Sequence, residues 1–260
     1  MPHRPHARLA LLTAALLAAA ATTTAADKVE HAPEAQAFVH GTPSKPSEAW
    51  TLAAGGRLYD NWWVALDRAE PTSTHPSYPA SGKAKGAATW RCKECHGWDY
   101  KGRDGRYRTG SHTTGIIGVM GARGRDEADL VRLLRAPVHG YTSDMMRDDE
   151  LLRVAAFINR GLHDMSDVIG ADDVPLGNVE RGKSIFQTIC AACHGFDGRL
   201  INWGTVEEPS YVGTEASRLP DEVLHKLRNS HPGAAMVNLR ALPLSDAVDV
   251  LTYAATLPTR

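Results

Sequence analysis

The stretch TWRCKECHGWDY at residues 89–100 contains two cysteines three positions apart, followed directly by a histidine. The same C-x-x-C-H unit returns in ICAACHG at residues 189–195, so all four cysteines of the chain lie in two copies of one motif. A redox-active dithiol has no need for a histidine at this place. A zinc ribbon brings its cysteine pairs close together in sequence, whereas these pairs begin at Cys92 and Cys190.

Covalent attachment of haem accounts for the whole motif, because two cysteines form thioether bonds to the macrocycle and the histidine binds the iron. Positions i, i+3 and i+4 of a helix share one face, so a single turn can present both sulfurs and the imidazole to one haem. The sequence therefore predicts two covalently bound haem c groups. The predicted attachment residues are Cys92, Cys95, Cys190 and Cys193, and the predicted iron ligands are His96 and His194.

The N-terminus predicts export. Arg4 and Arg8 precede an apolar run at residues 9–21, and small residues then offer a cleavage site near Ala26. These are the three parts of a secretory signal peptide, which we assign to residues 1–26. The apolar run is too short for a membrane span and no later run is longer, so we expect a periplasmic protein without a span after processing.

The composition is that of an ordinary globular protein. Of 260 residues 43% are apolar and 23% are charged, with a formal net charge of −1. Lysine and arginine are spread along the chain without a basic block, so nothing indicates binding to nucleic acid. We expect the partners to be other redox proteins.

An internal repeat organises the chain into two similar halves. Each half is expected to contain a first helix, a C-x-x-C-H turn, a connecting helix and a last helix. In chain order, the expected helices are 55–63, 125–136 and 149–161 in the first half, and 180–190, 220–230 and 245–258 in the second. In the first half, the motif is delayed by a segment rich in Pro, Ser, Gly and Ala at residues 64–89, here called the insertion, with little regular structure expected.

Each half resembles a class I cytochrome c domain. The resemblance is strongest in the second half, where CAACHG (190–195), PSYVG (209–213) and HPGAAM (231–236) follow the family order. It implies an all-α fold with two such domains in tandem, each around a covalent haem, and an irregular insertion in the first. The expected boundaries are a signal peptide at 1–26, an extension at 27–49, domain 1 at 50–162, a linker at 163–178 and domain 2 at 179–260.

The resemblance also implies particular contacts in the second half. Gly182 and Phe186 match positions at which the first helix packs against an aromatic residue of the last helix, here Tyr253. The carbonyl of Pro209 is expected to accept the ring N–H of His194. The first half has Gly55 and Tyr59 at the same spacing but no matching proline, so another carbonyl must serve His96.

Methionine is the usual second axial ligand in this family. Met236 is the expected ligand in the second half, with His231 as its rival. In the first half Met145 and Met146 lie side by side, and Met146 is slightly favoured because it is nearer the last helix. Met120 and His139 stay open as alternatives there. Two further histidines are expected to bind nothing, His75 as an exposed loop residue and His225 at the surface of the connecting helix.

The function expected from these features is single-electron transfer, since an iron with both axial positions filled has no site for a substrate. The alternatives are a dihaem oxidoreductase, either a peroxidase or similar to thiosulfate dehydrogenase, and an electron-accepting subunit of a dehydrogenase complex. The thiosulfate alternative is weakened because haem attachment uses every cysteine that could serve as an iron ligand.

Overall fold

The computed structural model describes residue 37 and residues 39–260, so the predicted signal peptide lies outside the described residues. In this part of the chain the secondary structure is helical, and β-pairing is limited to the isolated bridges Gly102–Ile117 and Ile169–Pro175. The all-α prediction is therefore confirmed for the described residues. Each described helix is too short or too polar to cross a membrane.

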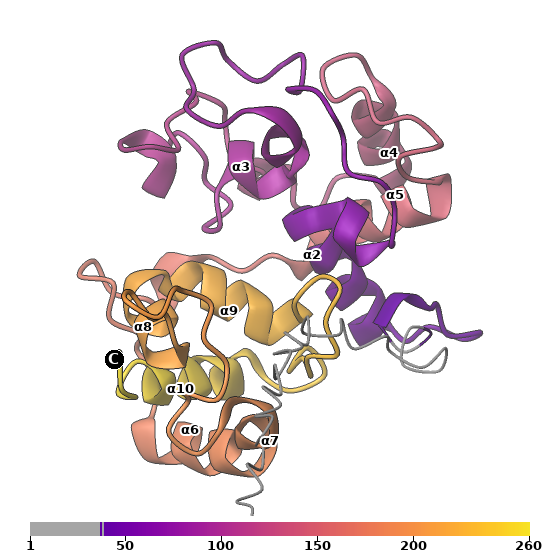
Figure 1. The fold of residues 1–260 in the computed structure, drawn as a ribbon. Coiled ribbons are helices and arrows are strands. Elements are labelled where there is room, and N and C mark those ends of the chain that lie inside the picture. The colour runs from indigo at the N-terminus through magenta and orange to yellow at the C-terminus, as the bar shows by residue number, and fades with distance from the viewer. Residues whose placement is uncertain (1–36, 38) are drawn as a thin grey trace, which may run out of the picture.

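The helices follow the order expected from the sequence (Figure 1). They are α2 (Glu48–Ala65), η1 (Gly86–Trp90), α3 (Cys92–His96), η2 (Arg106–Arg108), η3 (Met120–Ala122), α4 (Glu127–Arg135), α5 (Asp148–Ala156), η4 (Phe157–Gly161), η5 (Met165–Asp167), α6 (Val179–Ile185), η6 (Phe186–Cys190), α7 (Ala191–His194), α8 (Val212–Arg218), α9 (Pro220–Asn229) and α10 (Leu244–Ala254). Helix α8 is an element that the sequence did not predict.

A glycine sets the crossing of α2 and α5 in the first half. A Cβ atom on Gly55 would overlap the carbonyl oxygen of Arg153, so only glycine lets the two helices come this close. One turn further along α2, the ring of Tyr59 packs on Phe157 with ring centres 5.7 Å apart. Tyr59 is fully buried, and its hydroxyl donates to the carbonyl of Gly97 at 2.7 Å. This contact joins the helix pair to the residue after the first C-x-x-C-H motif.

The second half repeats the same crossing between α6 and α10. A Cβ atom on Gly182 would overlap the carbonyl oxygen of Asp249, and the ring of Phe186 lies 5.5 Å from that of Tyr253. The contact that the family resemblance implied for Gly182, Phe186 and Tyr253 is therefore present. Helix α6 is capped at its start, where the side chain of Asn178 accepts from the Arg181 amide at 2.9 Å.

The two halves pack against each other through α2 and α9, around the completely buried His225. Its Nε2 donates to the carbonyl of Gly56 at 2.9 Å, so Nδ1 is the unprotonated nitrogen and accepts from the hydroxyl of Tyr100 at 2.8 Å. The prediction that His225 lies at the surface was wrong. The pattern of α9 alone does not reveal that α2 covers this face of the helix.

Polar contacts reinforce the same interface. Asp221 at the start of α9 pairs with Arg106 at 3.2 Å, and Arg240 donates to the carbonyl of Gly161 at 2.8 Å. The ion pair itself adds little net free energy of folding, because desolvation of the buried carboxylate offsets much of the attraction. The apolar core is also continuous, running from Leu58 in the first half to Leu257 near the C-terminus. The halves are thus joined by one core.

The insertion is irregular, as expected, but its histidine is not exposed. His75 is buried, and its ring lies 4.3 Å from that of Trp90. The prediction of an exposed loop histidine was wrong, because the insertion folds back onto the body of the first half. The indole N–H of Trp90 donates to the carbonyl of Ser73 at 2.8 Å, which fixes the returning chain.

The glycine contact between α6 and α10 can be tested by adding one methyl group. Gly182→Ala should lower the free energy of unfolding by about 1–3 kcal/mol, because the Cβ atom would force the helices apart. Gly121→Ala is the matched control, since a Cβ atom there meets no atom within 4 Å. Denaturant unfolding of both variants measures the difference, and equal stabilities would contradict the close crossing.

The buried His225 predicts a pH dependence of stability. Burial, the largest effect, lowers its pKa from 6.5 to about 4. As pH falls from 6.5 to 4, the unfolded chain takes up a proton that the folded chain does not. The free energy of unfolding should therefore fall over this window, by about 3 kcal/mol at most from this residue.

The His225→Asn variant should lose that part of the slope, whatever its stability at neutral pH. Denaturant unfolding at several pH values between 4 and 6.5 gives the slope for both proteins. An unchanged slope in the variant would mean that His225 titrates alike in the folded and unfolded chain.

Candidate haem-binding sites

Both C-x-x-C-H motifs form a single helical turn, as predicted. The first is α3, and in the second Cys190 ends η6 while Ala191–His194 form α7. Each turn ends at a glycine with positive φ, 80° at Gly97 and 79° at Gly195. This conformation is accessible to glycine at little cost and stops the helix directly after the histidine. The two motifs therefore have the same local geometry.

The four thiols are free and are not paired in disulfides. Burial raises the pKa of Cys92 to about 11, of Cys95 to about 12 and of Cys190 to about 11. Neutral thiols are poor nucleophiles in disulfide exchange, so these pairs do not suit a dithiol redox enzyme. They remain available for covalent attachment of haem, and to this extent the residues fit the group.

His96 has the tautomer that a metal requires. Its Nδ1 lies 2.7 Å from the carbonyl oxygen of Ile117. A carbonyl can only accept, so Nδ1 carries the hydrogen and Nε2 keeps its lone pair. Burial, the largest effect, lowers the pKa of His96 to about 4, which keeps the ring neutral near pH 7. Ile117 thus supplies the carbonyl for which the first half has no proline.

His194 lacks the corresponding partner. Its Nδ1 is buried and has no hydrogen-bond partner among the described residues, so the expected bond to the carbonyl of Pro209 is absent. The loop that carries Pro209 folds onto itself instead. The amide of Trp203 donates to the carbonyl of Ser210 at 2.9 Å, and the side chain of Asn202 accepts from the Ser210 amide at 2.9 Å.

Several exposed apolar side chains follow the second motif in sequence. Phe196 is 75% exposed, and the ring of Trp203 lies 5.8 Å from that of His194. Further exposed apolar side chains follow His194 or Met236 in sequence: Leu200, Ile201, Val206 and Val237. Such a set suits contact with a large apolar body, and the haem macrocycle is one. The segment that follows the second motif therefore offers apolar side chains that would suit the haem, and His194 offers an imidazole for its iron.

Met236 lies in the loop between α9 and α10, where it is half-buried at the edge of the core. Its carbonyl accepts from the hydroxyl of Ser230 at 2.8 Å, which ties the loop to the end of α9. His231, the rival ligand, is exposed, and its Nδ1 is 2.8 Å from the carbonyl of Pro232.

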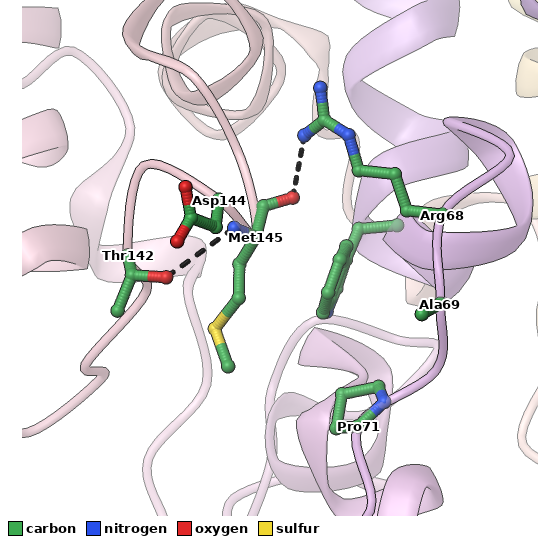
Figure 2. Close-up of a pocket in the computed structure, with 7 residues that line it drawn as sticks. Arg68, Ala69, Pro71, Thr142, Asp144 and Met145 are labelled. Carbon is green, nitrogen blue, oxygen red and sulfur yellow. Dashed lines mark hydrogen bonds between the residues drawn. The ribbon is translucent and has the colours of Figure 1, made fainter.

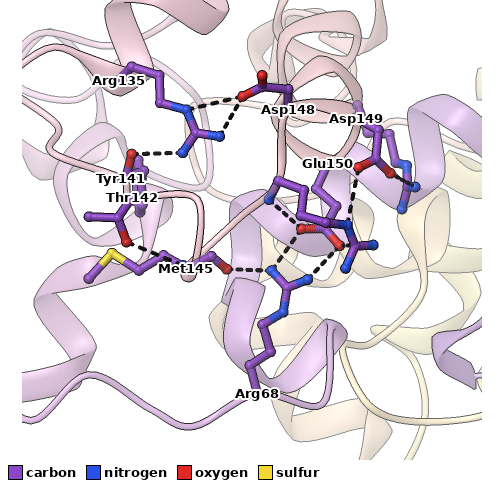
Figure 3. Close-up of polar contacts among 10 residues, drawn as sticks. Arg68, Arg135, Tyr141, Thr142, Met145, Asp148, Asp149 and Glu150 are labelled. Carbon is purple, nitrogen blue, oxygen red and sulfur yellow. Dashed lines mark hydrogen bonds and ion pairs between the residues drawn. The ribbon is translucent and has the colours of Figure 1, made fainter.

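The two adjacent methionines of the first half differ in their surroundings. Met146 is completely buried in the core, whereas Met145 is half-buried and its side chain enters a cavity of about 480 Å³ (Figure 2). Arg68 donates to the carbonyl of Met145 at 2.7 Å and also binds Glu150 at 2.7 Å (Figure 3). The residues that line the cavity are Trp62, Arg68, Ala69, Pro71, Thr142, Asp144 and Met145.

His139 is the candidate that lies beside the motif histidine. Its ring centre is 6.2 Å from that of His96, with an angle of 35° between the ring planes. Its Nδ1 is 3.1 Å from the carbonyl oxygen of Leu133. Met120, the remaining alternative, begins η3, where its amide donates to the carbonyl of Tyr100 at 3.2 Å.

Comparison with known proteins identifies the second half. Residues 177–253 match the family described as cytochrome c oxidase, cbb3-type, subunit III. No curated protein matches the chain. The matched segment includes the second C-x-x-C-H motif, Met236 and the crossing of α6 with α10. Residues 177–253 are therefore a cytochrome c domain, and the chain is in this part a c-type cytochrome.

Proposed function

We propose that the protein is a periplasmic dihaem cytochrome c that passes single electrons between redox partner proteins. The observation that carries the proposal is the repetition of one geometry in both halves. Each half combines a glycine-mediated crossing of its first and last helices with a C-x-x-C-H turn closed by a left-handed glycine. Residues 177–253 match a cytochrome c family, so in the second half this geometry belongs to a cytochrome c domain. The first half has the same geometry, which supports a haem there as well.

The second haem would be held by thioether bonds from Cys190 and Cys193, with His194 and Met236 as the axial ligands. The first would be held by Cys92 and Cys95, with His96 on one face of the iron. A bound haem supplies a reversible one-electron couple, whose potential depends on the axial ligands and on burial. The chain's own residues attach it, fix the imidazoles, and shield it from water. The proposed domains are 50–162 and 179–260, joined by the linker at 163–178.

The interface between the halves holds the first motif in a fixed position relative to the second half. The residues directly after the first motif contact α9 of the second half, since the ring of Trp98 lies 5.0 Å from that of His225. Tyr100 donates to the same histidine. A continuous packed interface keeps the separation of the two motifs fixed. Periplasmic location is proposed from the signal-like residues 1–26 and from the oxidising compartment in which such haem is attached.

The haem count tests the dihaem proposal directly. The mass of the denatured mature protein should exceed that of its polypeptide by two haems, because thioether bonds survive unfolding. The double substitution Cys92→Ala and Cys95→Ala should remove one of them. A mass that corresponds to one haem in the native protein would restrict the proposal to the second half, and the bare polypeptide mass would refute it.

Substitution of Met236 tests the second iron. Met236→Leu keeps the volume but removes the sulfur, so the oxidised protein should lose a methionine-to-iron charge-transfer band in the near infrared and its second haem should have a lower potential. Met165→Leu is the matched control, since Met165 is a buried core methionine in the segment between the halves. If both variants keep the native spectrum, Met236 only fills space and His231 becomes the leading ligand.

A further inference from the structure

The further inference concerns the second axial ligand of the first haem, and it rests on the proposed attachment of haem at Cys92, Cys95 and His96. We propose that His139 is this ligand, opposite His96, and that the insertion holds it in position. The first iron would then have two histidine ligands, whereas the second has histidine and methionine.

The spacing of the two imidazoles is the first observation. A bond from a metal to an imidazole nitrogen is about 2 Å long and the ring centre lies roughly 1 Å behind that nitrogen, so two imidazoles on one metal have centres about 6 Å apart. The centres of His96 and His139 are 6.2 Å apart. This separation is the one expected for two imidazole ligands of a single iron.

The tautomers are the second observation. The Nδ1 atoms of His96 and His139 each bond a backbone carbonyl, that of Ile117 at 2.7 Å and that of Leu133 at 3.1 Å. Since carbonyls only accept, both rings carry their hydrogen on Nδ1 and offer the lone pair of Nε2. A carbonyl bond on the far nitrogen is the usual orienting contact of a metal-bound histidine. Both imidazoles therefore have the tautomer in which Nε2 can bind a metal.

The methionines are less suited to this position. Met146 is 0% exposed, so other protein atoms cover it completely and leave no face of its sulfur for an iron. Met145 enters a cavity whose lining includes Trp62 and Arg68 but none of the residues of the first motif (Figure 2).

The insertion contacts the chain on either side of the His139 side chain. His75 donates from Nε2 to the carbonyl of His139 at 2.8 Å, and the hydroxyl of Ser77 donates to the carbonyl of Val138 at 2.7 Å. The Nδ1 of His75 accepts from the Ser77 amide at 3.0 Å, so both donors belong to one turn. The insertion therefore has a physical role in the first half, and His75 is a positioning residue for His139.

The experiment uses the full-length, haem-loaded protein and records low-temperature EPR and near-infrared magnetic circular dichroism of the oxidised form. The native protein should show one histidine–methionine haem and one bis-histidine haem. His139→Ala should abolish the bis-histidine signal and leave the other unchanged. Met145→Leu and Met146→Leu are the matched variants and should keep both signals.

Two methionine-ligated haems in the native protein, or loss of a methionine band in Met145→Leu or Met146→Leu, would overturn the inference. That result would leave the dihaem proposal intact, whereas the absence of the first haem would remove the basis of this inference and restrict the proposed function to the second half. The native spectrum decides the question even if His139→Ala does not assemble.

The positioning role of His75 can be measured separately from the identity of the ligand. His75→Ala should shift or split the bis-histidine EPR signal and change the potential of the first haem, because the backbone of His139 loses a hydrogen bond. His75→Gln keeps an N–H donor and should restore the native signal in full or in large part. If the alanine variant keeps the native signal and potential, the insertion does not position His139.

Discussion

The whole architecture depends on two close helix crossings in which a glycine removes the side chain that would keep the helices apart. Gly55 lies against the backbone of α5, and Gly182 lies against the backbone of α10. Each crossing is followed one turn later by an aromatic pair, Tyr59 with Phe157 and Phe186 with Tyr253. Close packing of backbones leaves little room for adjustment, so each crossing fixes the position of the first helix relative to the last.

The two halves differ in how the helix crossing is connected to the C-x-x-C-H motif. In the second half α6, η6 and α7 run without a break into the motif, so the crossing positions the haem-binding turn directly. In the first half the insertion separates α2 from α3, and Tyr59 reaches the motif through the carbonyl of Gly97 instead. The insertion then contributes His75 to the loop that carries His139. On this account the insertion holds a histidine where the second half has a methionine ligand. The reduction potential of the first haem would then be lower, because a histidine ligand lowers the potential relative to methionine.

Much of the fold could be predicted from the sequence, because the decisive signals are local. The motif, the i and i+4 spacing of Gly182 and Phe186, and the amphipathic last helices each appear within about ten residues. The burial of His225 could not be predicted, since it depends on α2 packing from more than 160 residues away in sequence. The burial of His75 could not be predicted either. It lies in an insertion of turn-forming residues, and such a segment has no hydrophobic periodicity that would show which side chains are buried.

The candidate site was predicted less completely for a related reason. The cysteines and histidines of the motifs follow from their spacing, whereas an axial ligand on a loop can come from any residue that the loop brings within reach. Met145, Met146 and His139 are close in sequence, and only their packing separates them. The expected bond from His194 to Pro209 is absent, and the 202–210 loop that carries Pro209 bonds within itself.

The central claim is that protein side chains fill both axial positions of both irons, which makes the protein an electron carrier. Carbon monoxide binding to the reduced native protein tests this most directly, since the gas binds ferrous haem readily only where an axial position is open. The account predicts no change in the absorbance of either haem at stoichiometric carbon monoxide. Rapid, stoichiometric binding at either haem would contradict it and would indicate a catalytic site.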